Sequence, residues 1–104
     1  MHSVVDARSF EGRRKPIAAE LGARAIKLNR YDSEPGQEGF EHDERESGQE
    51  EIYVPVEGAG SIRIGAEEVP LEPGRFVLVP PEERRQVVAG PEGLSYVVVG
   101  AIVR

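Results

Sequence analysis

The chain has 104 residues, with 13 basic and 19 acidic side chains and no cysteine, which predicts one domain without disulfides or thiolate metal ligands. The negative charge is concentrated in residues 33–72, which carry twelve acidic and two basic side chains. A segment this acidic repels phosphate backbones, so we expect no nucleic-acid partner.

Residues 1–22 are predicted to form an N-terminal arm that precedes the main domain. The arm contains one helical signal, KPIAAELG at 15–22. Pro16 suits the first turn of a helix, and Gly22 suits the position after its last turn. A helix this short is not stable alone, so packing has to hold it in place. Residues 23–104 are then the folded domain.

Short apolar runs separated by Gly and Pro make up the rest of the chain, a pattern typical of an all-β domain. The runs are AIKLNRY (25–31), EIYVPV (51–56), SIRIG (61–65), RFVLVP (75–80), RRQVVAG (84–90) and LSYVVVGAIV (94–103). Glycine-bearing segments between them predict turns at EGAG (57–60), GAEE (65–68) and EPG (72–74). Pro55 lacks a backbone N–H and therefore requires a strand edge or a bulge.

Two of these runs, 75–80 and 94–103, are apolar on both faces. A barrel of this size has too little interior to cover both faces, so we expect a homodimer. The longer run has about half of the ~20 apolar residues that a membrane helix needs, so we expect no membrane span. Charges interrupt residues 1–15, which predicts that no signal peptide is present. The expected location is the cytoplasm.

The stretch EEIYVPVEGAGSIRIGAEEVPLEPGRFVLVPPEE (50–83) resembles the centre of a small single-domain cupin of the RmlC-like superfamily. The similarity extends from about Pro35 to Val99, nearly two thirds of the chain. Two fragments carry it, EEIYVPVEG and EPGRFVLVPP, which look like the strand and turn signatures of the two cupin motifs. The resemblance implies a double-stranded β-helix, or jelly roll, with a pocket between two sheets.

The metal ligands of the cupin motifs are only partly present. The first motif has two histidines one residue apart, ahead of a glutamate, and its best match is His42, Glu44 and Glu51. In the second motif the position of the ligand histidine falls on Arg85. Imidazole and carboxylates bind divalent transition metals such as Zn, Ni, Mn or Fe, whereas arginine stays protonated and has no lone pair to offer. We therefore predict a degenerate metal site and no cofactor.

Arg85 is expected to serve another purpose in the pocket. Glu50 and Glu51 are adjacent on a strand and face opposite sides, and the cupin spacing favours Glu51 as the one that enters the pocket. Inward carboxylates without a metal need a counter-charge in a low-dielectric site. Arg85 can supply it by bidentate pairing with Glu51 or Glu44, so we expect an arginine–carboxylate cluster. Tyr53 is expected to be a core aromatic with its hydroxyl at the pocket rim.

Two interpretations of function stay open. In the first, the chain is a small-molecule-binding barrel in which Arg85 receives a carboxylate or another anion. In the second, it is a metal-dependent cupin enzyme (a dioxygenase, isomerase or decarboxylase) that uses His42, Glu44 and Glu51 and keeps one ligand position open. For His42, an exposed loop position and a role in proton transfer are further alternatives. The loss of the ligand histidine favours the first interpretation.

Overall fold

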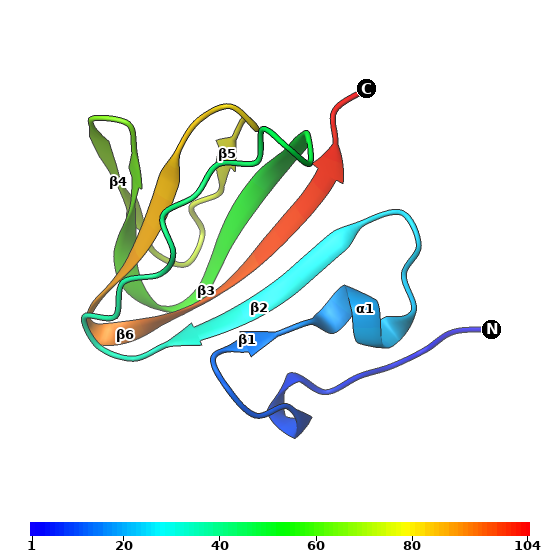
Figure 1. Ribbon diagram of the computed structural model, residues 1–104. Coiled ribbons are helices and arrows are strands. Elements are labelled where there is room, and N and C mark those ends of the chain that lie inside the picture. The colour runs from blue at the N-terminus through cyan, green and yellow to red at the C-terminus, as the bar shows by residue number, and fades with distance from the viewer.

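The computed structural model describes all residues, 1–104, and consists mainly of antiparallel strands (Figure 1). The strands are β1 (Arg14–Lys15), β2 (Lys27–Ser33), β3 (Gln49–Ile64), β4 (Glu67–Leu71), β5 (Val77–Val79) and β6 (Arg85–Ile102). The helical segments are the 3-10 turn η1 (Ala7–Ser9) and α1 (Ile17–Leu21). The strand order is β1-β2-β6-β3-β4, and β5 pairs with β3. The predicted all-β class is confirmed.

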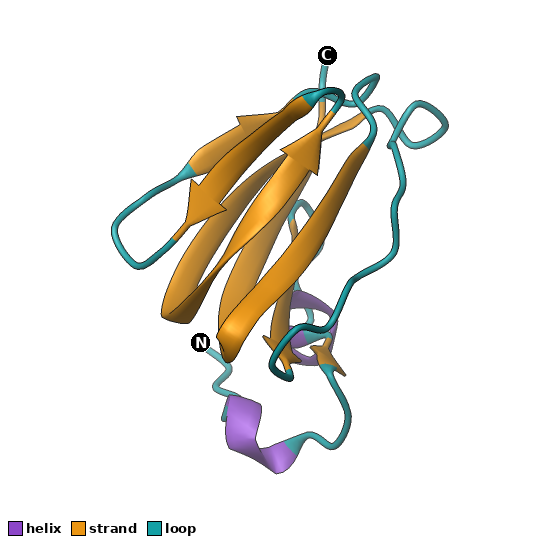
Figure 2. Ribbon diagram, turned by 90° about the vertical axis from the view of Figure 1, so that its left-hand side faces the viewer, coloured by secondary structure: helices purple, strands orange, loops and turns teal.

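The two long strands, β3 and β6, take part in both halves of the barrel. Residues 49–58 of β3 pair with residues 94–102 of β6, whereas residues 60–64 of β3 pair with residues 85–89 of β6. The first half is extended by β2 and β5 and the second by β4. Figure 2 shows that both helical segments lie together at one end of the strands. The side chains that alternate inward from both halves form the interior.

The predicted hairpin turn at EGAG (57–60) is wrong, because the chain continues through this segment as part of β3. Instead of reversing, β3 passes from one half of the barrel to the other through register shifts beside Pro55 and beside Gly58. The first of these shifts shows that, of the strand edge and the bulge expected at Pro55, the bulge is present. Glycine is needed because β3 and β6 cross closely here, and a Cβ on Gly58 would lie 2.2 Å from the carbonyl oxygen of Gly93.

The other two predicted turns are confirmed. The chain turns after β3 at Gly65, with φ of 59°, and after β4 at Gly74, with φ of 98°. Glycine tolerates such positive φ values at little cost. The strand between these turns, β4, was not predicted, because its sequence EEVPL has two adjacent charges and a proline in place of an apolar alternation. It lies at the end of the strand order, where proline is tolerated.

The core is one cluster of buried side chains that come from both halves of the barrel. Its members are Tyr53, Ile62, Leu71, Val79, Val87, Ala89, Leu94, Tyr96 and Val98. On β6 the buried members alternate within each half of the barrel, with a shift of one residue between Ala89 and Leu94. The burial of this cluster stabilises the barrel and fixes which residues of β3 and β6 face its interior.

The predicted short helix is present as α1, which ends at Gly22 in the left-handed conformation, with φ of 81°. The chain just before it forms β1, which pairs with β2 at the edge of the sheet, so the arm adds a strand to the barrel. Figure 1 shows this N-terminal part, in blue, beside β2. No helix of the chain is long and apolar enough to cross a bilayer.

Asp32 ties the N-terminal arm to the barrel. Its carboxylate accepts hydrogen bonds from the side chains of Lys15 in β1, Arg30 in β2 and Ser95 in β6. Burial alone would raise the pKa of Asp32, but these hydrogen bonds outweigh it and lower the pKa to about 2. Asp32 is therefore ionised at neutral pH and holds three strands together on the outer face of the sheet.

Candidate functional site

A half-open cavity of about 740 Å³ is lined by side chains from both halves of the barrel. It is lined by alternate residues of the strands, because successive side chains of a strand point to opposite faces. The lining residues of β2 are Lys27, Asn29 and Tyr31, and those of β3 are Gln49, Glu51 and Tyr53. All five site residues named from the sequence line this one cavity, namely His42, Glu44, Glu51, Tyr53 and Arg85.

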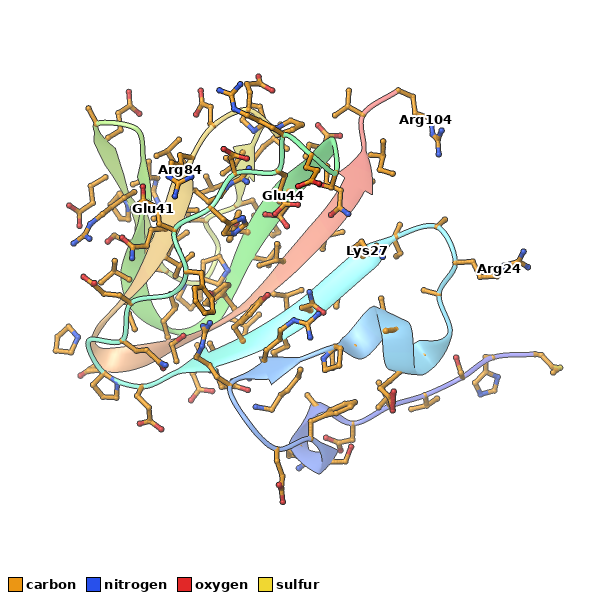
Figure 3. All side chains as sticks on the ribbon, viewed as in Figure 1. Arg24, Lys27, Glu41, Glu44, Arg84 and Arg104 are labelled. Carbon is orange, nitrogen blue, oxygen red and sulfur yellow. The ribbon has the colours of Figure 1, made fainter.

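Neighbours in sequence show the same alternation. Glu50, next to Glu51, is exposed, as expected for a residue on the opposite face. Arg84, next to Arg85, lies outside as well, and its Nε donates a hydrogen bond of 2.9 Å to Glu41 Oε2. Figure 3 shows Arg84 and Glu41 side by side. Strand geometry therefore decides which member of each charged pair reaches the cavity.

The side chain of Arg85 is fully buried, with 0% of it exposed. Its Nη2 donates hydrogen bonds to the main-chain carbonyl oxygens of Pro80 (2.8 Å) and Val79 (3.3 Å), at the end of β5. Its Nε and Nη1 have no hydrogen-bond partner in the protein. A buried donor without an acceptor costs roughly 1–3 kcal/mol, and more when it is charged. Arg85 is thus a cation with unused donors beside the cavity.

The expected bidentate pairing of Arg85 with a carboxylate is wrong. Arg85 Nη1 lies 4.0 Å from Glu51 Oε1, which brings the opposite charges together but is too long for a hydrogen bond. The two residues lie in different halves of the barrel, and the carbonyl groups of β5 hold the guanidinium back. Glu51 Oε1 instead accepts a 2.8 Å hydrogen bond from the hydroxyl of Tyr53. Arg85 has no contact of this kind with Glu44.

His42 is fixed against β6 by its main chain. Its N–H donates to the carbonyl oxygen of Arg85 at 2.9 Å, and the N–H of Arg85 donates back at 2.8 Å. This bridge places His42 beside Arg85 at the cavity, with 39% of the His42 side chain exposed. His42 Nδ1 lies 2.9 Å from Glu44 Oε2, and Ser47 donates to Glu44 Oε1 at 2.7 Å. His42 is therefore a partly exposed residue that lines the cavity.

Three tyrosines form one wall of the cavity. Tyr31 and Tyr96 stack with ring centroids 5.1 Å apart, and Tyr53 lies 6.3 Å from Tyr96. Burial raises the pKa of Tyr53 well above its usual range, and the nearby charge of Glu51 and their hydrogen bond raise it further. Burial also raises the pKa of Tyr96. Both hydroxyls stay protonated at neutral pH, and that of Tyr53 donates to Glu51.

His42, Glu44 and Glu51 are the one group of side chains arranged as metal ligands. Their donor atoms all lie within 4.8 Å of one another, and three protein ligands are usual in a catalytic zinc site. Glu44 and Glu51 each accept a hydrogen bond through one oxygen, from Ser47 and Tyr53, as ligating carboxylates commonly do. The guanidinium of Arg85, 4.0 Å from Glu51, offsets the attraction of one carboxylate for a cation. The three donors match the ligand chemistry of a divalent cation, and the charge of Arg85 weakens the attraction of such a cation to this place.

The lining of the cavity carries more positive than negative charge, although the whole chain has a net charge of −6. Its cations are Arg13, Arg14, Lys27 and Arg85, and its carboxylates are Glu44 and Glu51. A cavity lined by one sign of charge raises the local concentration of ligands of the opposite sign. The field inside therefore favours an anion.

Comparison with known proteins identifies the fold and the family. Residues 31–101 match the family model of the AraC-like ligand binding domain. Similar solved structures include a cupin protein from Bacteroides fragilis (TM-score 0.84, 19% identity, 98% of this chain and 85% of that chain). Others are a sugar phosphate isomerase of a cupin superfamily from Silicibacter pomeroyi (0.75, 23%, 91% and 68%) and an RmlC-like cupin from Shewanella frigidimarina (0.66, 21%, 77% and 68%). No curated protein matches the chain.

These identities are low, so the solved structures show a shared fold and not a shared ligand. The fold they share is the double-stranded β-helix implied by the resemblance of residues 50–83 to cupins, which is thereby confirmed. The family match covers more than half of the chain and runs from β2 to the end of β6, through the strands that enclose the cavity. The chain therefore belongs to the family of AraC-like ligand binding domains, built on the cupin barrel.

Proposed function

We propose that the chain is a cytoplasmic small-molecule-binding barrel that recognises an anionic ligand through Arg85 and needs no metal to do so. One observation supports this proposal above others: Arg85 is 1% exposed, lines the cavity, and has two nitrogens without a hydrogen-bond partner. An oxyanion supplies both the acceptors and the opposite charge that these donors need, and charge-assisted hydrogen bonds are roughly twice as strong as neutral ones. A carboxylate is the simplest such group.

The metal-dependent enzyme is the second candidate. It is favoured by the group of His42, Glu44 and Glu51, whose donor atoms lie within 4.8 Å of one another. One of the similar structures is described as a sugar phosphate isomerase, which is a property of that protein. In this chain the positive charge of Arg85 opposes a metal at the same place, and we therefore rank binding above metal-dependent catalysis.

Calorimetric titration of the untagged protein with butyrate and with butyramide, its uncharged counterpart, tests the proposed function. We expect butyrate to bind at least ten times more tightly than butyramide at low salt, because only the carboxylate pairs with Arg85. Arg85→Met should abolish this preference. Elemental analysis of the same sample tests the second candidate function, which requires a bound metal. A stoichiometric transition metal that His42→Ala removes, together with equal affinities for both probes, would overturn the proposal.

We also propose that a second copy of the chain covers the outer face of the first half of the barrel. Leu28, Val99, Ile52 and Leu78 are direct neighbours across β2, β6, β3 and β5. Ile52 is 40% exposed and Leu78 56% exposed. Such a row of apolar side chains gains about 25 cal/mol for each Å² removed from water. A two-fold axis would place the row of one copy against that of the other.

Sedimentation velocity at micromolar concentration tests this association. The wild-type chain should sediment as a dimer, and Leu78→Glu should sediment as a monomer, because the new charge would be buried at the interface. The matched control is Val4→Glu, which places the same charge at a position 84% exposed in the arm and should leave the dimer intact. A monomeric wild type, or a dimer that tolerates Leu78→Glu, contradicts the proposed interface.

A further inference from the structure

The cavity holds a second arginine that is fixed in place. Arg13 lies just before β1, and its guanidinium carbon is 5.0 Å from the centroid of the Tyr31 ring. Its Nη1 donates a 3.3 Å hydrogen bond to the hydroxyl of Ser33. Tyr31 in turn stacks on Tyr96, so the surface under the guanidinium is rigid. A cation held in this way loses little conformational freedom when a ligand binds.

No carboxylate neutralises Arg13. It takes part in none of the ion pairs of the chain. A Cβ placed on Gly39 would lie 3.9 Å from both Arg13 Nη1 and the Tyr96 hydroxyl oxygen. The guanidinium and this hydroxyl therefore converge on one place, and the missing side chain of Gly39 leaves room there. Both groups carry protons that a ligand can accept, and although burial raises the pKa of the Tyr96 hydroxyl, Arg13 beside it acts in the opposite direction.

The Arg13 guanidinium and the Tyr96 hydroxyl lie along the same cavity, at a distance from Arg85. The N–H of Gly39 donates to the carbonyl oxygen of Val87 at 2.8 Å, which fixes the position of Gly39 along β6. Val87 is two residues beyond Arg85, which corresponds to about 7 Å along a strand. Val87 and Val98 line the cavity together with the three tyrosines. The wall therefore has apolar side chains as well as the cations of Arg85 and Arg13.

We propose that the ligand carries two anionic groups, one bound by Arg85 and the other by Arg13 with Tyr96, joined by a short carbon chain. The inference rests on the proposed function, because it takes the Arg85 contact as its first half. Arg13 and Arg85 are two of the three arginines that line the cavity, and neither makes a hydrogen bond to a carboxylate of the protein. A ligand with one anionic group would leave Arg13 without a counter-charge in the complex. A dicarboxylate is the simplest ligand that serves both.

Titration calorimetry with two matched series of probes tests this inference. The first series contains dicarboxylates from succinate to pimelate, and the second contains the monocarboxylates of the same chain lengths. We expect at least one dicarboxylate to bind ten or more times as tightly as its matched monocarboxylate. In Arg13→Gln the dicarboxylate should bind no more than about twice as tightly as its matched monocarboxylate. The affinity for monocarboxylates should stay within about twofold of the wild-type value. The control is Arg24→Gln, which removes the same charge from an exposed side chain that points away from the barrel (Figure 3) and should preserve the preference for the dicarboxylate.

The outcomes separate this inference from the proposed function. If monocarboxylates bind through Arg85 but no dicarboxylate binds more tightly, the second anionic contact is refuted while the first stands. The second contact is also refuted if Arg13→Gln still binds the dicarboxylate more tightly than its matched monocarboxylate. It is refuted as well if Arg24→Gln loses this preference, because the preference then comes from net charge. If neither series binds, the proposed function fails and the inference fails with it.

Discussion

Arg85→Met is expected to stabilise the ligand-free chain by about 1–3 kcal/mol, while it abolishes the binding of anions. A buried guanidinium loses several kcal/mol of hydration, and this loss is not recovered where the charge has no hydrogen-bonded counter-charge. In Arg85 two nitrogens have no partner, and the nearest carboxylate oxygen, on Glu51, is 4.0 Å away. The hydrogen bonds to Val79 and Pro80 recover only part of the loss.

Urea unfolding in a buffer without carboxylates or phosphate measures this effect, and Arg84→Met is the matched control. Arg84 is exposed and pairs with Glu41 at the surface, so its replacement should change the free energy of unfolding by no more than about 0.5 kcal/mol. If Arg85→Met instead destabilises the chain by more than about 2 kcal/mol, the guanidinium holds the barrel together through the carbonyl groups of β5. Its role would then be structural, and the case for ligand recognition would be lost.

The sequence was sufficient for most of the strands but not for the way they cross. Alternation in the apolar runs and the Gly/Pro punctuation between them predict strands, and Pro55 predicts either a strand edge or a bulge, of which the bulge is found. The glycines at 57–60 predict a turn, although β3 continues through them. Glycine reaches positive φ at little cost, and this suits a turn and a bulge equally. Only the close approach of β6, with Gly93 against Gly58, distinguishes the two. That approach is a long-range contact, which local sequence does not contain.

The candidate site was predictable in its members and not in its hydrogen bonds. Motif spacing and strand alternation brought His42, Glu44, Glu51 and Arg85 to one cavity. Whether Arg85 reaches Glu51 depends on about 1 Å of separation between the two halves of the barrel, because charge-assisted hydrogen bonds need about 2.7–2.9 Å. Arg13 could not be found in this way, since it belongs to the arm and reaches the cavity only through the pairing of β1 with β2.

Gly58→Ala is expected to have the largest effect on stability, a loss of about 4 kcal/mol or more. The added Cβ would lie 2.2 Å from the carbonyl oxygen of Gly93 and 3.0 Å from its carbonyl carbon. Both are backbone atoms, so relief requires β3 and β6 to move apart where the two halves of the barrel meet. The φ of 78° adds strain of about 1 kcal/mol for alanine. The whole free energy of unfolding of a small domain is only about 5–15 kcal/mol.

Gly36→Ala separates the two causes, because Gly36 has a similar φ of 72° but no atom within 4 Å of its added Cβ. It should cost about 1 kcal/mol, from backbone strain alone. In thermal unfolding, 1 kcal/mol shifts the midpoint of a domain of this size by about 4–8 °C, so Gly58→Ala should melt at least ~15 °C below the wild type. Equal shifts for both variants would mean that β3 and β6 separate easily at Gly58. The crossing that holds Glu51 and Arg85 in different halves of the barrel, 4.0 Å apart, would then be a soft element. A fixed distance between them could not be what keeps Arg85 from a hydrogen bond with Glu51.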